Sequence, residues 1–207
     1  MIRIGILGDI GAGKSYVAKK FGYPVFNADD EVALLYKKDK KIFNKLKKKL
    51  PKYIHSFPIN KKEVSRAILV NKSNLGKIIK IVHLEIRKRL NIFLKKNKNK
   101  KFIILDIPLL LENKINNKKD ILIYVESKKY MVQKQLKKRK NFNQKLLIKF
   151  KSIQFPNNYK KKKSRFILKS YLTQITRKKC ICNILKQIIW MKVVVLDTVA
   201  TGISIKE

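Results

Sequence analysis

One short segment near the N-terminus constrains the fold of this chain more than any other. It reads Gly8-Asp9-Ile10-Gly11-Ala12-Gly13-Lys14-Ser15 and matches G-x-x-x-x-G-K-[ST] at every fixed position. The apolar run of residues 2–7 before it indicates a buried strand, and residues 14–21 after it have helix-forming side chains. Glycines lack a Cβ, so the backbone N–H groups of such a loop can converge on a phosphate. The segment therefore predicts a strand, a phosphate-binding loop and a helix in succession.

The loop also predicts its ligand, a nucleoside triphosphate with Mg²⁺, although the loop alone does not distinguish a kinase from a GTPase or an ATP-driven machine. Lys14 is expected to bridge the β- and γ-phosphates, and the Ser15 hydroxyl to bind Mg²⁺ beside a phosphate oxygen. All eight residues of the segment are candidate ATP-binding residues. The alternative is a chance match in a glycine-containing turn, but the position of the motif between a strand and a helix argues against it.

The rest of the chain alternates short apolar runs with helical patterns. We expect strands over residues 2–7, 25–26, 102–107, 121–125 and 166–168. Residues 31–99 are helical in pattern with breaks at Pro51 and Pro58, and residues 128–153 predict two helices around a basic turn. This alternation predicts an α/β fold, a parallel sheet flanked by helices. Ligands of such sheets bind outside the carboxyl ends of the strands, so the loops after the strands should line the site.

Two acidic residues distinguish among the P-loop classes. Asp29 follows the second strand, where a carboxylate could accept the proton of an attacking hydroxyl. The alternative is an N-cap for a helix starting near Glu31, a role that fits Asp30 better than Asp29. The position of Asp29 therefore favours a kinase with a catalytic base.

Asp106 ends the apolar run of the third predicted strand, in the manner of a Walker B acid. A carboxylate among buried strands requires a cation or hydrogen-bond donors. We expect it to lie near Mg²⁺ or the substrate. A structural hydrogen bond to the phosphate-binding loop is the alternative.

Composition raises the question of a polyanionic partner. The chain has 52 lysines and arginines against 13 acidic residues, a net charge of +39. Only seven of these are arginines, the residue that bidentate phosphate and base recognition favours, and the lysines are spread along most of the chain. We therefore favour a compositional bias at surface positions over nucleic-acid binding.

Composition also bears on location and metal content. No apolar run approaches the roughly 20 residues of a membrane span, so we expect a cytoplasmic protein. Cys180 and Cys182 are expected to be reduced thiols on a helix, without a structural metal.

Several segments together resemble the dephospho-CoA kinase family, over roughly residues 1–189. They are the segment of residues 5–18, Val25-Phe26-Asn27-Ala28-Asp29, His83-Leu84-Glu85-Ile86-Arg87, Asp106-Ile107-Pro108-Leu109-Leu110-Leu111-Glu112, Gln135-Leu136-Lys137-Lys138-Arg139 and Gln154-Phe155-Pro156. The phosphate-binding loop is generic, whereas the Asn-Ala-Asp and Asp-Ile-Pro-Leu-Leu segments are more specific. The resemblance implies transfer of the ATP γ-phosphate to the ribose 3′-hydroxyl of dephospho-CoA.

The resemblance also implies a division of the chain. Residues 1–190 would form a P-loop kinase domain with a core of residues 1–29, 102–126 and 164–190. A helical CoA-binding insertion would occupy residues 30–101 and a lid residues 127–163. Residues 191–207 would be an additional tail.

Individual roles follow from the same resemblance. Asp29 would be the base, Lys14 the γ-phosphate clamp and Arg139 the lid arginine that reaches the phosphates. The acceptor-facing residues would be His83, Arg87, Asp106, Pro108 and Leu109. For His83 the alternative is an ordinary core or helix-surface histidine, and for Arg139 one more charge in a basic run.

Three positions depart from the family pattern. Asn27 stands where the family usually has aspartate, and Leu84 replaces proline. Arg165 replaces an acid before the last strand, which bears on how the C-terminal segment packs at the adenine pocket.

The tail of residues 191–202 resembles the opening strand of proofreading 3′–5′ exonucleases, whose pattern is Asp-x-Glu-x-x-Gly. Val199 replaces the second acid, so Asp197 lacks its partner for two-metal chemistry and no nuclease is expected. The tail could be the fused or read-through start of a neighbouring reading frame beginning at Met191. An ordinary apolar C-terminal strand is the alternative.

Two other functions remain as alternatives. One is another small-metabolite kinase of the nucleoside monophosphate or shikimate type. The other is a basic nucleic-acid-binding NTPase. The sequence leaves the oligomeric state and the kinetic constants open.

Overall fold

A computed structural model of the chain describes residues 1–138 and 142–201, with the backbone alone from residue 192 onward. Its centre is a five-stranded sheet with the order β2-β3-β1-β4-β5, and every neighbouring pair is parallel. The strands are β1 (Ile2–Gly8), β2 (Val25–Asn27), β3 (Phe102–Asp106), β4 (Ile121–Glu126) and β5 (Phe166–Lys169). The predicted α/β parallel sheet is confirmed, and each expected strand is present within two residues of its predicted ends.

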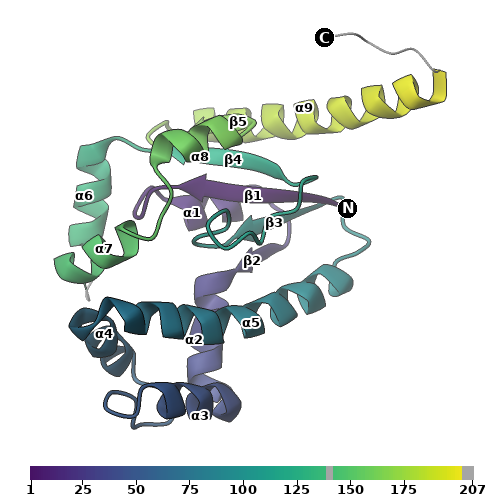
Figure 1. Ribbon diagram of the computed structural model, residues 1–207. Helices are drawn as coiled ribbons and strands as arrows, with labels where there is room; N and C mark the ends of the chain where they lie inside the picture. Colours follow the sequence, from purple (N-terminus) through teal and green to yellow (C-terminus); the bar gives the residue numbers. More distant parts are fainter. Residues whose placement is uncertain (139–141, 202–207) are drawn as a thin grey trace.

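Nine helices within the described residues surround this sheet (Figure 1). They are α1 (Lys14–Lys20), α2 (Ala28–Lys38), α3 (Lys40–Lys49), α4 (Lys61–Val70), α5 (Lys72–Lys96), α6 (Lys129–Lys137), α7 (Gln144–Lys151), α8 (Asn157–Lys163) and α9 (Gln174–Thr201). In Figure 1 the layer α2–α5 lies below the sheet and α9 crosses above it. Across the described residues, none of these helices has both the length and the apolar character to cross a bilayer.

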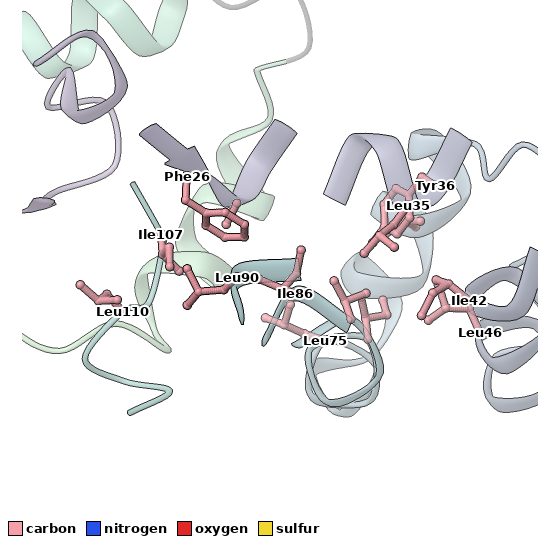
Figure 2. Close-up of a cluster of buried hydrophobic side chains, with 14 of the residues drawn as sticks. Phe26, Leu35, Tyr36, Ile42, Leu46, Leu75, Ile86, Leu90, Ile107 and Leu110 are labelled. Atoms are coloured by element: carbon pink, nitrogen blue, oxygen red, sulfur yellow. The ribbon is translucent and has the colours of Figure 1, made fainter. Parts of the chain in front are cut away.

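Successive side chains of a strand point to opposite faces of the sheet. The strands therefore contribute residues to two separate apolar cores, one on each face. One face packs against α1 and the buried isoleucines of α9, namely Ile181, Ile184 and Ile188. The other face packs against α2–α5, and Figure 2 shows how this core runs from Phe26 and Ile107 into the helices around Leu35 and Leu75. The strand run Phe102–Asp106 is buried throughout, as expected for a central strand covered on both faces.

The start of α2 corrects one sequence expectation. The helix begins at Ala28 rather than near Glu31, and its N-cap is Asn27, whose Oδ1 accepts from the Asp30 backbone N–H at 3.0 Å. The capping role expected for Asp30 is therefore wrong. Asn27, four residues before the predicted helix start at Glu31, already supplies the capping acceptor, so both aspartates lie in the first helical turn.

The C-terminal segment corrects a second sequence expectation, which concerned the tail after residue 190. The alternative of a strand over the tail is wrong, because α9 continues as one helix from Gln174 to Thr201. No glycine or proline interrupts the sequence between these residues, so nothing local ends the helix where the apolar tail begins.

Candidate active site

The phosphate-binding loop lies at the carboxyl end of the central strand β1, as predicted. Two of its glycines are required by geometry. Gly13 precedes α1 in the left-handed region, with φ 87°, where a side chain would be strained. A Cβ on Gly8 would stand 2.7 Å from the Val125 carbonyl oxygen. Gly13 is therefore required by its backbone conformation, and Gly8 by the close approach of the loop to the sheet.

Lys14 turns its side chain back across this loop. Its Nζ donates to the carbonyl oxygens of Asp9 at 2.9 Å and Gly8 at 3.2 Å. Burial lowers the pKa of Lys14, and the negative charges of Asp106 and Asp29 partly offset that effect. A buried ammonium group with acids nearby is suited to an anionic ligand, because a phosphate would favour its charged form.

Asp106 lies at the end of β3, where the adjacent strand β2 delivers Asn27. The Asn27 Nδ2 donates to Asp106 Oδ2 at 2.9 Å, and the register pairs these two residues directly. Burial raises the pKa of Asp106, whereas a hydrogen bond from Ser15 and the charge of Lys14 lower it. Ser15 is also the predicted magnesium ligand in the phosphate-binding loop. Its hydrogen bond to Asp106 is the link to the loop that the sequence offered as the alternative to a functional role.

These groups open onto one cavity of about 590 Å³. On its phosphate side the cavity is lined by the loop residues Ile10, Gly11, Gly13, Lys14 and Ser15. Asp29 and Asp106 line it as well, which brings both predicted acids to the same space as the predicted ATP lysine. Asp9 and Ala12 lie on the other side of the loop, where they border a second cavity of about 690 Å³ beneath α6–α8.

The opposite wall of the 590 Å³ cavity is apolar. It is formed by residues of α2, α4 and α5: Val32, Tyr36, Val64, Ile68, Leu75, Ile78, Ile79, Val82 and Ile86. Burial raises the pKa of Tyr36 to about 12. Its hydroxyl, neutral at physiological pH, can serve as a hydrogen-bond donor. The cavity therefore joins an anion-binding end to a long apolar wall.

The predicted acceptor residues are only partly gathered here. His83, Pro108 and Leu109 line the cavity, whereas Arg87 is not among its described lining residues. Arg87 is exposed, and its Nη2 donates to the Asn113 carbonyl oxygen at 2.8 Å. Sequence reasoning missed Asn113, because no motif marks it and its partners lie 26 and 30 residues away.

Helices α7 and α8 are each held to the rest of the protein by a lysine, partly buried in α7 and buried in α8. Lys149 Nζ donates to the Ile68 and Leu69 carbonyl oxygens at the end of α4, at 2.7 and 2.6 Å. Lys160 forms a 3.0 Å ion pair with Glu112 in the loop after β3. Both side chains of that pair are nearly inaccessible, so this region is held against the loop that carries Pro108 and Leu109. The predicted lid residue Arg139 lies outside the described residues.

Comparison with known proteins gives one consistent result. The family model for dephospho-CoA kinase matches residues 2–174. A dephospho-CoA kinase of Wolbachia sp. subsp. Brugia malayi is 34% identical over 170 residues, covering 80% of this chain and 87% of that protein. The dephospho-CoA kinase of Wolbachia pipientis wMel is 33% identical over the same shares of both chains.

Solved structures agree in fold. A crystal structure from Thermus thermophilus matches with a TM-score of 0.74 at 23% identity, covering 90% of this chain and 97% of that one. The dephospho-CoA kinase from Campylobacter jejuni matches with a TM-score of 0.51 at 18% identity, covering 90% and 96%. Deoxyadenosine kinase from M. mycoides also has a TM-score of 0.51, with 19% identity over 89% of this chain and all of that one. The architecture is that of the P-loop kinases.

Proposed function

The chain belongs to the dephospho-CoA kinase family, and from that premise we propose how its residues carry out the reaction of the family. The protein transfers the γ-phosphate of ATP to the 3′-hydroxyl of dephospho-CoA, giving coenzyme A and ADP. The observation that carries the assignment of roles is the single cavity that joins Lys14, Ser15, Asp29 and Asp106 to an apolar wall.

At the ATP end, residues 8–15 would hold the β-phosphate through backbone N–H groups, and Lys14 would move from the loop carbonyls to bridge the β- and γ-phosphates. Ser15 and Asp106 are the oxygen ligands that suit Mg²⁺, which takes few protein ligands and completes its shell with phosphates and water. When bound, Mg²⁺ neutralises charge on the transferring phosphoryl group. Asn27 would keep Asp106 oriented toward it.

Asp29 would act as the general base. It lines the cavity from the first turn of α2, and the capping role that competed with catalysis belongs to Asn27 instead. A carboxylate in this place can accept the proton of the acceptor hydroxyl and aim its oxygen at the γ-phosphate. Arg139 is proposed as a further cation on the transferring group, on the strength of the family resemblance alone.

The apolar wall would receive the acceptor. Dephospho-CoA carries a long, weakly polar pantetheine arm, and burial of apolar surface stabilises binding by about 25 cal/mol for each Å² removed from water. AMP and shikimate lack such an arm. The wall therefore supports selection for dephospho-CoA, and His83, Pro108 and Leu109 line the same cavity.

An acceptor panel tests this assignment. ADP release with purified protein, ATP and Mg²⁺ should be stimulated strongly by dephospho-CoA and far less by AMP, adenosine or shikimate. Equal stimulation by AMP would contradict the acceptor, while leaving ATP-dependent phosphotransfer intact.

The role of Asp29 is tested by Asp29→Asn, with Asp30→Asn as the matched control one residue along the same helical turn. We expect turnover to fall by about a hundredfold or more in the first variant because proton transfer is lost. Asp30→Asn should remain near the wild-type rate. Near-normal turnover of Asp29→Asn would exclude the base role.

Two further expectations stay predictions: a cytoplasmic location, and a compositional bias at surface positions rather than nucleic-acid binding as the origin of the high positive charge.

A further inference from the structure

Asn113, in the loop after β3, joins three groups at the acceptor end of the cavity. Its backbone N–H and its side-chain Nδ2 both donate to the Leu109 carbonyl oxygen, at 3.0 and 3.1 Å. The same Nδ2 lies 3.4 Å from His83 Nε2. Its carbonyl oxygen accepts from Arg87 Nη2. One side chain thus connects the loop to helix α5, although Asn113 and His83 are 30 residues apart.

The contact with Leu109 fixes which end of the Asn113 amide faces His83. If Oδ1 stood in the place of Nδ2, two acceptor oxygens would face each other at 3.1 Å, so the NH₂ group must lie there. An NH₂ group has only donors to offer. His83 Nε2 must therefore be the acceptor, and the proton of the neutral imidazole must be on Nδ1.

The neutral form of His83 is consistent with its surroundings. Burial lowers the pKa of His83, and the positive charge of Arg87 on the same helix lowers it further. The residue lines the cavity, and within the described part of the chain its Nδ1 makes no hydrogen bond. The Nδ1–H is thus available as a donor on a residue that faces the acceptor space.

The loop itself is held in an unusual conformation by the same asparagine. Leu109 has φ 60°, in the left-handed region that bulky residues rarely adopt because the conformation is strained. The two Asn113 donors on the Leu109 carbonyl oxygen offset that strain. Strained backbone conformations of this kind concentrate at ligand-binding sites, and Leu109 lines the cavity.

We propose that Asn113 is a positioning residue that holds His83 as the neutral Nδ1–H tautomer, so that His83 donates a hydrogen bond to an oxygen of the acceptor. The acceptor assignment rests on the proposed function. The tautomer itself does not, because it follows from contacts within the protein. Residue 113 would then set acceptor affinity without touching the phosphates.

The tautomer can be read directly by ¹⁵N NMR of the full chain without substrates. The chain has two histidines, His55 and His83, so the spectrum contains two imidazole systems, which His55→Gln assigns. We expect the proton of His83 on Nδ1 at pH 7.5. A proton on Nε2 would overturn the proposal whatever the variants do.

Two variants complete the test, with Asn116→Asp as the control, because Asn116 lies in the same loop and forms no side-chain hydrogen bond in the described structure. Asn113→Asp replaces the donor by an acceptor, so the His83 proton should move to Nε2. The KM for dephospho-CoA should rise about tenfold, the equivalent of one hydrogen bond, while kcat and the KM for ATP change less than about twofold.

Asn113→Ala should give an intermediate rise in acceptor KM and a mixed tautomer. An unchanged tautomer in Asn113→Asp would overturn the positioning role. A protein whose tautomer behaves as expected but which fails to phosphorylate dephospho-CoA would instead refute the proposed acceptor.

Discussion

The two ends of the 590 Å³ cavity are built in different ways. The proposed donor end is formed mainly by one short segment of the phosphate-binding loop, which contributes Ile10, Gly11, Gly13, Lys14 and Ser15 and requires glycine at Gly8 and Gly13. The acceptor end is assembled from side chains of α2, α4, α5 and the loop after β3, which are far apart in the sequence. Chemistry common to all P-loop kinases is thus fixed by local backbone geometry. Selection of the acceptor depends on tertiary contacts, which can change without disturbing the donor end.

The largest expected effect is on turnover, and it comes from a substitution at the donor end of the cavity that leaves the acceptor end intact. Lys14→Ala removes the cation that would bridge the transferring phosphates, so turnover should fall by about a hundredfold to a thousandfold. Lys19→Ala, on an exposed position of the same helix, should stay within about twofold. Steady-state ADP release measures both. A Lys14→Ala enzyme with normal turnover and only a raised KM for dephospho-CoA would reverse the assignment of the two ends.

Asn27 donates a hydrogen bond to Asp106 and caps α2, which carries part of the apolar wall. Its loss should mainly lower the free energy of unfolding. Asn27→Ala removes the cap of α2 and the donor to the buried Asp106, so the free energy of unfolding should fall by roughly 2–3 kcal/mol. Asn71→Ala removes only an exposed cap, that of α5, and should cost about 1 kcal/mol.

The pH dependence of this loss distinguishes the two contributions. Burial raises the pKa of Asp106 above the ordinary 3.8, so the folded protein holds the proton to higher pH than the unfolded chain does. Stability from this group therefore falls as pH rises from 3.8 through the folded pKa. Without the Asn27 donor that pKa rises further, so the destabilisation should be larger at pH 7 than at pH 4. Equal losses at both values in urea titrations would show that only the cap matters.

A smaller effect should be confined to the acceptor end. Ile79→Ala shortens a partly buried side chain of the apolar wall, and the KM for dephospho-CoA should rise about tenfold, the scale of a few lost methylenes. The KM for ATP should not change. Ile92→Ala, at a 66% exposed position of the same helix, is the control. A parallel rise in both KM values would show that the two ends are not independent.

The strand, loop and helix around residues 8–15 were predicted correctly because the information that specifies them is local. The strand, loop and helix follow one another along the chain, and each glycine and apolar residue acts within its own segment. Asp106 was predicted as an acid at the end of a buried strand, but its partner was not. The Asn27–Asp106 bond joins residues 79 apart, which only the order of strands in the sheet brings together.

The acceptor end was predicted mainly through family resemblance, and its geometry differs from the expectation in particular places. Arg87 was expected to face the acceptor, yet it is exposed and donates to the Asn113 carbonyl oxygen. Asn113 itself gave no sequence signal, since an asparagine among many asparagines in a lysine-rich chain is unremarkable until its partners are known. Contacts between a loop and a distant helix depend on packing, which periodicity does not encode.

The smallest effect is expected outside both ends. The buried residues of α9 that pack on the sheet are Ile181, Ile184 and Ile188, and Met191 packs partly against the same core. Removing residues 192–207 leaves all four in place, so kinase activity should stay within about twofold and the free energy of unfolding should fall by less than about 1 kcal/mol, under the value of burying one large apolar side chain. Truncation after Leu185 is the matched comparison. It removes Ile188, which is fully buried, and should cost about 2–5 kcal/mol through the lost core contact. A loss of more than about 2 kcal/mol on removing residues 192–207 would mean that the tail belongs to the folded kinase.

The tail should also add no second activity. The full chain should show no Mg²⁺-dependent exonuclease activity, because Val199 replaces one of the two acids that two-metal chemistry requires.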